Sequence, residues 1–332
     1  MTVVAVDAMG GDFAPQAAVE GALIAARGGV DVVLVGDAAA VGRELARLGA
    51  TPANVRVVHA SDAIAMDQHD ALDARHRKES AVYVALQLLR RGEADAFVSA
   101  GNTGAVVTLA LVVLGRLPGA ERPALGALLP LPPGPCLLLD CGANAESRAS
   151  HLVQFGLLGA AYVRAVLGVA EPRVGLLSIG EEPGKGTPAV IEAHAALAVA
   201  PGLRFLGNVE GREITTGRAD VVVTDGFTGN VALKLAEGVI EMLLLELRRA
   251  ALASWRGRLG GLLLRPQVRA LADQLDYRRA GAAPLLGVDG AVYIAHGRSD
   301  GAAVANAVRG AADAAAHGVR EAVAASVRGA RA

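Results

Sequence analysis

The sequence is poor in cysteine and carries almost no net charge. It has two cysteines in 332 residues, Cys136 and Cys141, and their spacing matches no metal-ligand motif. So low a cysteine content is typical of a reducing cytoplasm. The 32 Lys and Arg residues nearly balance the 33 Asp and Glu residues, for a net charge of −1, so charge does not favour binding to nucleic acid. We expect a cytoplasmic protein with no metal, no cofactor and no nucleic-acid partner.

Long apolar runs are also lacking. Hydrophobic residues make up 53% of the chain and the mean hydropathy is +0.40, but abundant alanine raises both values. No apolar run approaches the roughly 20 residues that a membrane-spanning helix needs. No cationic region precedes the first apolar residues, and Asp7 soon interrupts them. The N-terminus is therefore interpreted as a first strand and not as a signal peptide.

Lysine is scarce among the basic residues. Of 32 Lys and Arg residues, only Lys78, Lys185 and Lys234 are lysines. In a chain so rich in arginine, a lysine can mark a place where a compact ammonium group is required and a guanidinium group does not fit. Lys185 lies in a glycine-rich turn and Lys234 lies just after one.

Residues 219–238 have the pattern of a strand, a tight turn and a helix. A run of β-branched residues ends at Asp225 and Gly226, and helical spacing resumes after Thr228, Gly229 and Asn230. Such a turn directs the free N–H groups of the first helical turn to a point beyond the strand. The pattern predicts a site for an anion or a developing oxyanion.

The same pattern occurs earlier, at residues 95–106. The two copies align as D-x-x-V-(S/T)-x-G-x-T-G-x-V, and the first supplies Asn102, Thr103 and Gly104. Two such units suggest two turns that line one cleft at the carboxyl edge of a parallel sheet, where open α/β folds bind ligands. The alternative is that both turns are helix N-caps whose glycines allow tight packing.

Polar residues also follow other predicted strands. We regard them as candidates for lining the same cleft; they are Asp7 with Gly10 and Gly11, Asn144, Asn208 and His296. His296 fits a general base or a cleft-lining donor, although a lone histidine is more often structural. None of these turns has the G-x-G-x-x-G spacing, which counts against a nicotinamide enzyme.

Lys185 stands between Gly184 and Gly186, directly after a predicted strand at 174–179. The flanking glycines allow a ligand to approach closely, and the spacing of a P-loop is missing. We interpret this lysine as functional rather than merely solvated.

Two segments predict contacts with larger partners. Arg75, Arg77 and Lys78 precede a predicted helix at 80–91, and they suit either an acidic partner or phosphate, or else a solvated helix start. Residues 248–271 combine Trp255 and the leucines 262–264 with interspersed arginines. That composition predicts a helical hairpin that binds a membrane surface, a second copy of the chain, or both.

Roughly ten alternations of strand and helix, with no internal linker, predict a three-layer α/β fold with a mainly parallel sheet. We expect residues 1–332 to form a single large catalytic domain that includes the hairpin. The residues alone therefore predict a cytoplasmic α/β enzyme that handles an anion such as phosphate.

The chain resembles the phosphate acyltransferase (PlsX) family of bacterial phospholipid synthesis. The resemblance runs in order over nearly the whole chain, through residues 6–12 (VDAMGGD), 99–105 (SAGNTGA), 139–144 (LDCGAN), 176–182 (LLSIGEE), 185–186 (KG), 207–212 (GNVEGR), 225–230 (DGFTGN) and 281–287 (GAAPLLG). It implies transfer of a long-chain acyl group from acyl-[acyl carrier protein] to inorganic phosphate. The acyl phosphate would feed a membrane glycerol-3-phosphate acyltransferase.

The resemblance also implies a fold similar to phosphotransacetylases and isocitrate-dehydrogenase-like proteins, a homodimer, and peripheral association with the inner face of the cell membrane. In this interpretation Lys185, Asn230, Asp225 and His296 are the catalytic group. Substrate binding would fall to Asp7, Gly10, Gly11, Asn102, Thr103, Gly104, Asn144, Asn208, Gly226, Thr228 and Gly229. Arg75, Arg77 and Lys78 would contact the carrier protein, and Trp255 with Leu262, Leu263 and Leu264 would contact the membrane.

Three other functions stay open on the sequence. An acetyl-coenzyme A phosphotransacetylase is the nearest enzyme. A β-decarboxylating dehydrogenase would need a carboxylate cluster for metal and a nucleotide site, and no convincing version of either is found. A non-catalytic scaffold for carrier protein and membrane would leave Lys185, Asn230 and the duplicated turn unexplained.

Overall fold

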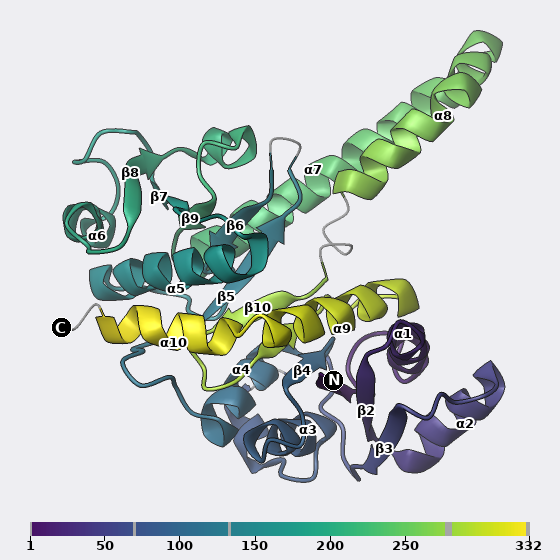
Figure 1. Ribbon diagram of the computed structural model, residues 1–332. Helices are drawn as coiled ribbons and strands as arrows, with labels where there is room; N and C mark the ends of the chain where they lie inside the picture. The colour runs from purple at the N-terminus through teal and green to yellow at the C-terminus, as the bar shows by residue number, and fades with distance from the viewer. Residues whose placement is uncertain (1, 69–70, 132–133, 276–280, 330–332) are drawn as a thin grey trace.

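The computed structural model describes residues 2–68, 71–131, 134–275 and 281–329. In these described ranges, eleven strands form one sheet, and helices cover both of its faces (Figure 1). The strands are β1 (Val3–Asp7), β2 (Asp31–Gly36), β3 (Val55–His59), β4 (Ala96–Ser99), β5 (Ala124–Leu129), β6 (Cys136–Leu139), β7 (Arg173–Leu177), β8 (Arg204–Val209), β9 (Val221–Val223), β10 (Ala283–Leu286) and β11 (Val292–Ile294).

The helices alternate with these strands along most of the chain. They are α1 (Gln16–Arg27), α2 (Ala38–Leu48), α3 (Ala81–Arg90), α4 (Thr103–Val113), α5 (Ala149–Leu167), α6 (Pro188–Ala198), α7 (Gly226–Leu252), α8 (Trp255–Leu275), α9 (Gly301–Ala316) and α10 (Val319–Gly329), with 3-10 helices η1 (Ala71–His76) and η2 (Gly211–Thr216).

The sheet consists of two parallel halves that run in opposite directions. The strand order is β3-β2-β1-β4-β11-β10-β5-β6-β9-β7-β8. Seven of the ten pairings are parallel, and the three antiparallel ones are β11–β10, β10–β5 and β5–β6. Three reversals between β4 and β9 leave these two strands antiparallel. The sequence had suggested that the duplicated turns lie at one common edge of the sheet. The structure shows that they do not.

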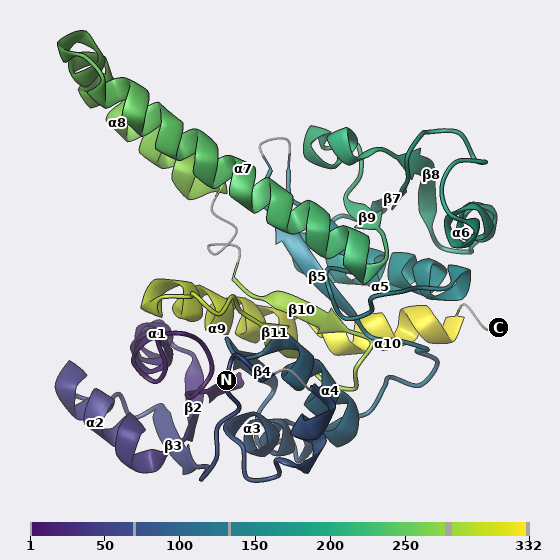
Figure 2. The same cartoon turned by 180° about the vertical axis from the view of Figure 1, so that it is seen from behind.

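Alternating side chains on the strands build a core on each face. On one face, Val221 and Val223 of β9 pack with residues of α5, and β1 packs under α1 and α9. On the other face, Phe97 of β4 packs with α3 and α4, while Val222 belongs to a smaller cluster beside Leu233 of α7. Helices α4 and α7 thus cover the same face of the sheet, with β5 and β10 between them (Figure 2).

A long helical hairpin projects from the body of the molecule (Figures 1 and 2). Helix α7 continues from Gly226 to Leu252 without a break, and α8 returns antiparallel beside it from Trp255. The sequence predicted a hairpin at 248–271, and the structure extends it over nearly the whole of both helices. Trp255, Leu262, Leu263 and Leu264 are 59–70% exposed, so this apolar surface is uncovered in the single chain.

Helix α5 is the one described helix that is long and apolar enough to cross a membrane. Its 19 residues have a mean hydropathy of 1.2, and 67% of the span is buried inside the protein. The apolar character of α5 is therefore explained by its position in the core, where it covers β6 and β9.

Candidate active site

The first residue of the duplicated motif has the same structural role in both copies. Asp95 accepts a hydrogen bond from the backbone N–H of Val3 (2.7 Å), at the start of the neighbouring strand β1. Asp220 accepts one from the N–H of Arg173 (2.7 Å), at the start of β7. Each aspartate fixes its own strand against its parallel neighbour, so this part of the motif is explained by the fold.

A buried aspartate lies beside each glycine-rich turn. Asp7, at the end of β1, accepts hydrogen bonds from Ser99 Oγ (2.7 Å) and from the Met9 N–H (3.0 Å). Asp140, directly after β6, accepts from the N–H groups of residues 125, 142, 143 and 144 and from the Asn144 amide. Burial raises the pKa of both carboxyl groups, and these hydrogen bonds oppose the rise.

Several glycines are required by close packing between turns. A Cβ on Gly10 would lie 2.4 Å from Asp7 Oδ2, and one on Gly11 would lie 3.1 Å from the Gly297 carbonyl. In the other half, a Cβ on Gly226 would lie 2.4 Å from the Asn144 carbonyl, and one on Gly229 would lie 1.9 Å from the Asp140 carbonyl. Tight packing accounts for these glycines, and their contact with substrate stays a prediction.

Four of the predicted site side chains are engaged within the protein: those of Asn102, Asn144, Asp225 and Thr228. Asn102 caps α4 by accepting from the Ala105 N–H (3.0 Å), and Asp225 caps α7 by accepting from the Thr228 N–H (2.8 Å) and Oγ1 (2.7 Å). Asn144 donates to the Pro123 carbonyl (2.7 Å). The Gly226 N–H is used as well, because it donates to the Asn144 carbonyl (2.9 Å).

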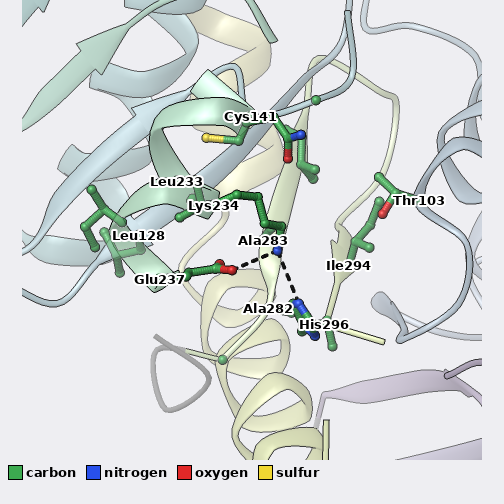
Figure 3. A pocket seen from close by; sticks show the side chains of 17 residues that line it. Thr103, Leu128, Cys141, Leu233, Lys234, Glu237, Ala282, Ala283, Ile294 and His296 are labelled. Carbon is green, nitrogen blue, oxygen red and sulfur yellow. Dashed lines mark hydrogen bonds and ion pairs between the residues drawn. The ribbon is translucent and has the colours of Figure 1, made fainter. Parts of the chain in front are cut away.

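A cavity of about 340 Å³ lies between α4 and α7, above β5, β10 and the end of β11 (Figure 3). Thr103, from the first copy of the motif, and Asn230, from the second, both line it, and so does His296. The two turns meet here because α4 and α7 begin on the same face of the sheet, although β4 and β9 run in opposite directions. The residues that line the cavity are Thr103, Leu125, Ala127, Leu128, Leu129, Cys141, Gly142, Asn230, Leu233, Lys234, Glu237, Gly281, Ala282, Ala283, Ile294, Ala295 and His296.

Lys234 is the cationic centre of this cavity. Its Nζ lies 2.9 Å from Glu237 Oε2 and 3.2 Å from His296 Nε2 (Figure 3). Burial, followed by the nearby Lys234 charge, lowers the pKa of His296. The Arg298 N–H also lies 3.1 Å from His296 Nδ1; the neutral ring has one acceptor nitrogen and therefore accepts from either Arg298 or Lys234, not from both.

Glu237 is held beside Lys234 with one oxygen unused. Its side chain is 14% exposed, and its buried Oε1 has no hydrogen-bond partner among the described residues. Sequence reasoning did not select Glu237, and it noted Lys234 without a role. The scarcity of lysine was the one signal for this pair, because a Lys and a Glu three residues apart are common on any helix.

Lys185 lies outside the lining of this cavity, in the exposed turn that follows β7. Ser178 Oγ donates to the Lys185 carbonyl (2.9 Å), and Asn208 Nδ2 donates to the Glu182 carbonyl (2.8 Å). The buried Asn208, which also contacts His194 (2.9 Å), therefore shapes the turn that carries Lys185. Because β7 and β9 are adjacent and parallel, this turn and the start of α7 lie at the same edge of the sheet.

The predicted carrier-protein cluster separates into two kinds of residue. Arg77 is bound to Asp62 (Nε to Oδ2, 2.6 Å) and to the Ala63 carbonyl (3.2 Å), so it holds the preceding loop in place. Arg75 and Lys78 are exposed, and Arg75 Nε donates to His76 Nε2 (3.0 Å). Within the described parts of the chain, no group of three or more His, Cys, Asp or Glu residues is arranged to hold a metal ion.

The chain matches the family described as "Fatty acid synthesis protein" over residues 2–322. It is 54% identical to the phosphate acyltransferase of Thermus thermophilus over 305 residues, which cover 92% of each chain. It is 46% identical to the phosphate acyltransferase of Nitratidesulfovibrio vulgaris, over 94% of this chain and 90% of that one.

Solved structures give a more distant likeness. A phosphotransacetylase from Streptococcus pyogenes has a TM-score of 0.65 at 18% identity and covers 95% of this chain and 94% of its own. A 4-hydroxythreonine-4-phosphate dehydrogenase from Klebsiella pneumoniae has a TM-score of 0.56 at 14% identity, over 93% and 98% of the two chains. These likenesses show the fold alone and confirm the predicted α/β class. The sequence relatives decide the family: the chain belongs to the phosphate acyltransferases.

Proposed function

We propose that this enzyme transfers a long-chain acyl group from acyl-[acyl carrier protein] to inorganic phosphate. The observation that carries the proposal is the cavity in which Lys234 and His296 face the helix starts of both motif copies, in a member of the phosphate acyltransferase family. Residues 1–332 act as one catalytic unit in this proposal. The acyl phosphate passes to a glycerol-3-phosphate acyltransferase at the membrane.

The reaction needs no covalent enzyme intermediate. An oxygen of hydrogen phosphate attacks the thioester carbonyl carbon, the C–S bond breaks, and the thiolate takes up the proton that hydrogen phosphate brought. The enzyme has to hold the anion, stabilise the tetrahedral oxyanion and pass on one proton. Cys141 lines the cavity, but burial raises its pKa and keeps it a thiol, so it is unsuited to act as a nucleophile.

Lys234 and His296 fit two of these tasks. The Lys234 ammonium can donate to the oxyanion, and the neutral His296 ring beside it can pass the proton to the thiolate. Phosphate is assigned to Lys185, Asn230 and the positive end of the α7 dipole, because the Lys185 turn and the start of α7 share one edge of the sheet.

The partners follow from the exposed surfaces. Arg75 and Lys78 offer positive charge to an acidic carrier protein. The exposed leucines of the hairpin favour a peripheral contact with the membrane, a second protomer, or both. A cytoplasmic enzyme that works at the inner face of the membrane agrees with both surfaces.

The test is a phosphate-dependent assay of the purified protein with palmitoyl-[acyl carrier protein] and acetyl-coenzyme A side by side, without added metal or nucleotide. Acyl phosphate from the palmitoyl donor alone is the expected result. Lys185→Ala and Lys234→Ala should each lower turnover by about 10²–10³-fold, the usual loss for one donor to a reacting anion. Lys78→Ala should instead raise the KM for the carrier protein.

Turnover with acetyl-coenzyme A alone would make the protein a phosphotransacetylase. No turnover with either donor would favour a non-catalytic scaffold. Full activity in Lys185→Ala would remove that residue from the phosphate site and leave Lys234 as the one lysine in the mechanism.

A further inference from the structure

A second cavity, the apolar groove, lies along α7 next to the reactive one. It has a volume of about 430 Å³ and is lined by residues of α7 such as Ala236 and Val239 and, from the body, by Leu131, Leu177 and Ile214. Among the described residues that line it, Glu237 is the one that is ionisable. The volume is within the roughly 300–1,000 Å³ of ordinary small-molecule sites.

The groove and the reactive cavity share a wall. Leu129 of β5 and Leu233 and Glu237 of α7 line both of them. The groove therefore begins where the reactive cavity ends, one helical turn beyond Lys234. The reacting side chains Lys234 and His296 and the apolar lining of the groove are thus separated by no more than the shared residues Leu129, Leu233 and Glu237.

Glu237 marks the junction between the two. Its Oε2 contacts Lys234, while the buried Oε1 has no partner within the part of the chain that the structure describes. The Glu237 carboxylate thus lies where the polar lining of the reactive cavity gives way to the apolar lining of the groove.

We propose that the apolar groove binds the acyl chain of the donor, with the thioester carbonyl at Lys234 and the chain extending past Leu129 and Leu233 toward Ile214. The inference rests on the proposed function. An acyl chain fits better than a protein segment, because the groove adjoins the cavity of the reacting groups at Leu129, Leu233 and Glu237 and every buried methylene adds binding free energy. The exposed leucines nearer the hairpin tip, such as Leu243 and Leu262, remain for other contacts.

The test compares binding of palmitoyl- and butanoyl-[acyl carrier protein] to the full-length protein by fluorescence anisotropy, in phosphate-free buffer so that no transfer takes place. Ala236→Trp fills the groove from α7. The Kd for the butanoyl donor divided by the Kd for the palmitoyl donor should fall about tenfold, because the palmitoyl chain loses the burial of about two methylene groups. Ala250→Trp, an exposed alanine farther along the same helix, should leave the ratio unchanged.

A second variant guards against misfolding. Thr215→Trp enters the groove from η2, on the opposite wall, and Thr215 is exposed, so the core is not disturbed. The same loss of preference in both variants supports the proposal. An equal loss for both donors, or no loss in either variant, would overturn it.

The remaining outcomes separate the alternatives. A change in sedimentation mass for Ala236→Trp with an unchanged Kd ratio would assign the groove to a second copy of the chain and overturn the proposal. Adding phosphate to the same samples tests the proposed function by itself. Tighter binding of the palmitoyl donor without formation of acyl phosphate would support acyl-chain binding in the apolar groove and refute the proposed acyl transfer to phosphate.

Discussion

The start of α7 packs so closely against the turn after β6 that one methyl group should displace it. In Gly229→Ala the new Cβ would lie 1.9 Å from the Asp140 carbonyl oxygen and 2.9 Å from Thr224 Cγ2. Ordinary contact begins near 3.4 Å, so the helix start has to move by about 1.5 Å. Overpacking typically costs about 1–3 kcal/mol, and the better helix propensity of alanine returns at most about 1 kcal/mol.

Asn230 follows Gly229 directly, so the displacement should reach the cavity. A misplacement of about 1 Å can cost about 10²-fold in rate, and we expect kcat/KM to fall by that factor together with a lower Tm. The matched control is Gly238→Ala on the same helix, where a Cβ meets no atom within 4 Å. The control should raise the free energy of unfolding by up to about 1 kcal/mol and leave kcat/KM unchanged.

Calorimetry and the phosphate-dependent assay on both variants decide the question. Wild-type Tm and activity in Gly229→Ala would refute the packing argument. A normal Tm with lost activity would instead show that Gly229 contacts substrate, as the sequence had predicted for it.

Two further predictions concern the hairpin and the histidine. Replacing Leu262, Leu263 and Leu264 with serine should weaken binding to anionic vesicles more than about a hundredfold, since each buried leucine contributes about 1.5–3 kcal/mol, while Val199→Ser, an exposed apolar residue on the body, should not. Unchanged co-sedimentation with vesicles but a halved mass in ultracentrifugation would assign the leucines to a dimer. For His296, the lowered pKa means that the unfolded chain, with an ordinary value near 6.5, takes up the proton first. Its contribution to stability is then present above about pH 6.5 and is lost as the pH falls through the folded pKa. A proton NMR titration should place the His296 midpoint below about 6.5; a midpoint at or above that value would contradict the buried, neutral ring.

Local pattern was enough to predict the strand, turn and helix around Asn230 and around Thr103, because glycine-rich turns and capping residues act within a few positions of the chain. The pattern could not tell whether Gly226 approaches a ligand or another turn. That depends on Asn144, which the fold brings beside it from another strand. Glycine and asparagine occur both in turns that approach a ligand and in turns that pack against another turn.

The relative direction of the two half-sheets was also beyond local reasoning. It depends on β10 and β5, which pair with each other through only two residues each. The hydrophobic periodicity of such short strands predicts neither which strands lie beside them nor whether the pairing is parallel or antiparallel. Lys234 and Glu237 were missed as a site for a similar reason. Only the arrival of His296 from β11 distinguishes this pair from an ordinary surface ion pair.

Helix α7 joins chemistry and surface in one rigid rod. Its first turn packs against the Asp140 turn, Lys234 and Glu237 follow within about three turns, and exposed leucines such as Leu247 and Leu252 lie toward its far end, beside α8. The 27 residues span about 40 Å, and Lys234 lies about 12 Å from the fixed end. A tilt of about 5° around that end would move the tip by about 3.5 Å and the lysine by about 1 Å. A surface that displaces the tip therefore displaces Lys234 by about one third of that distance, a ratio set by the length of the helix.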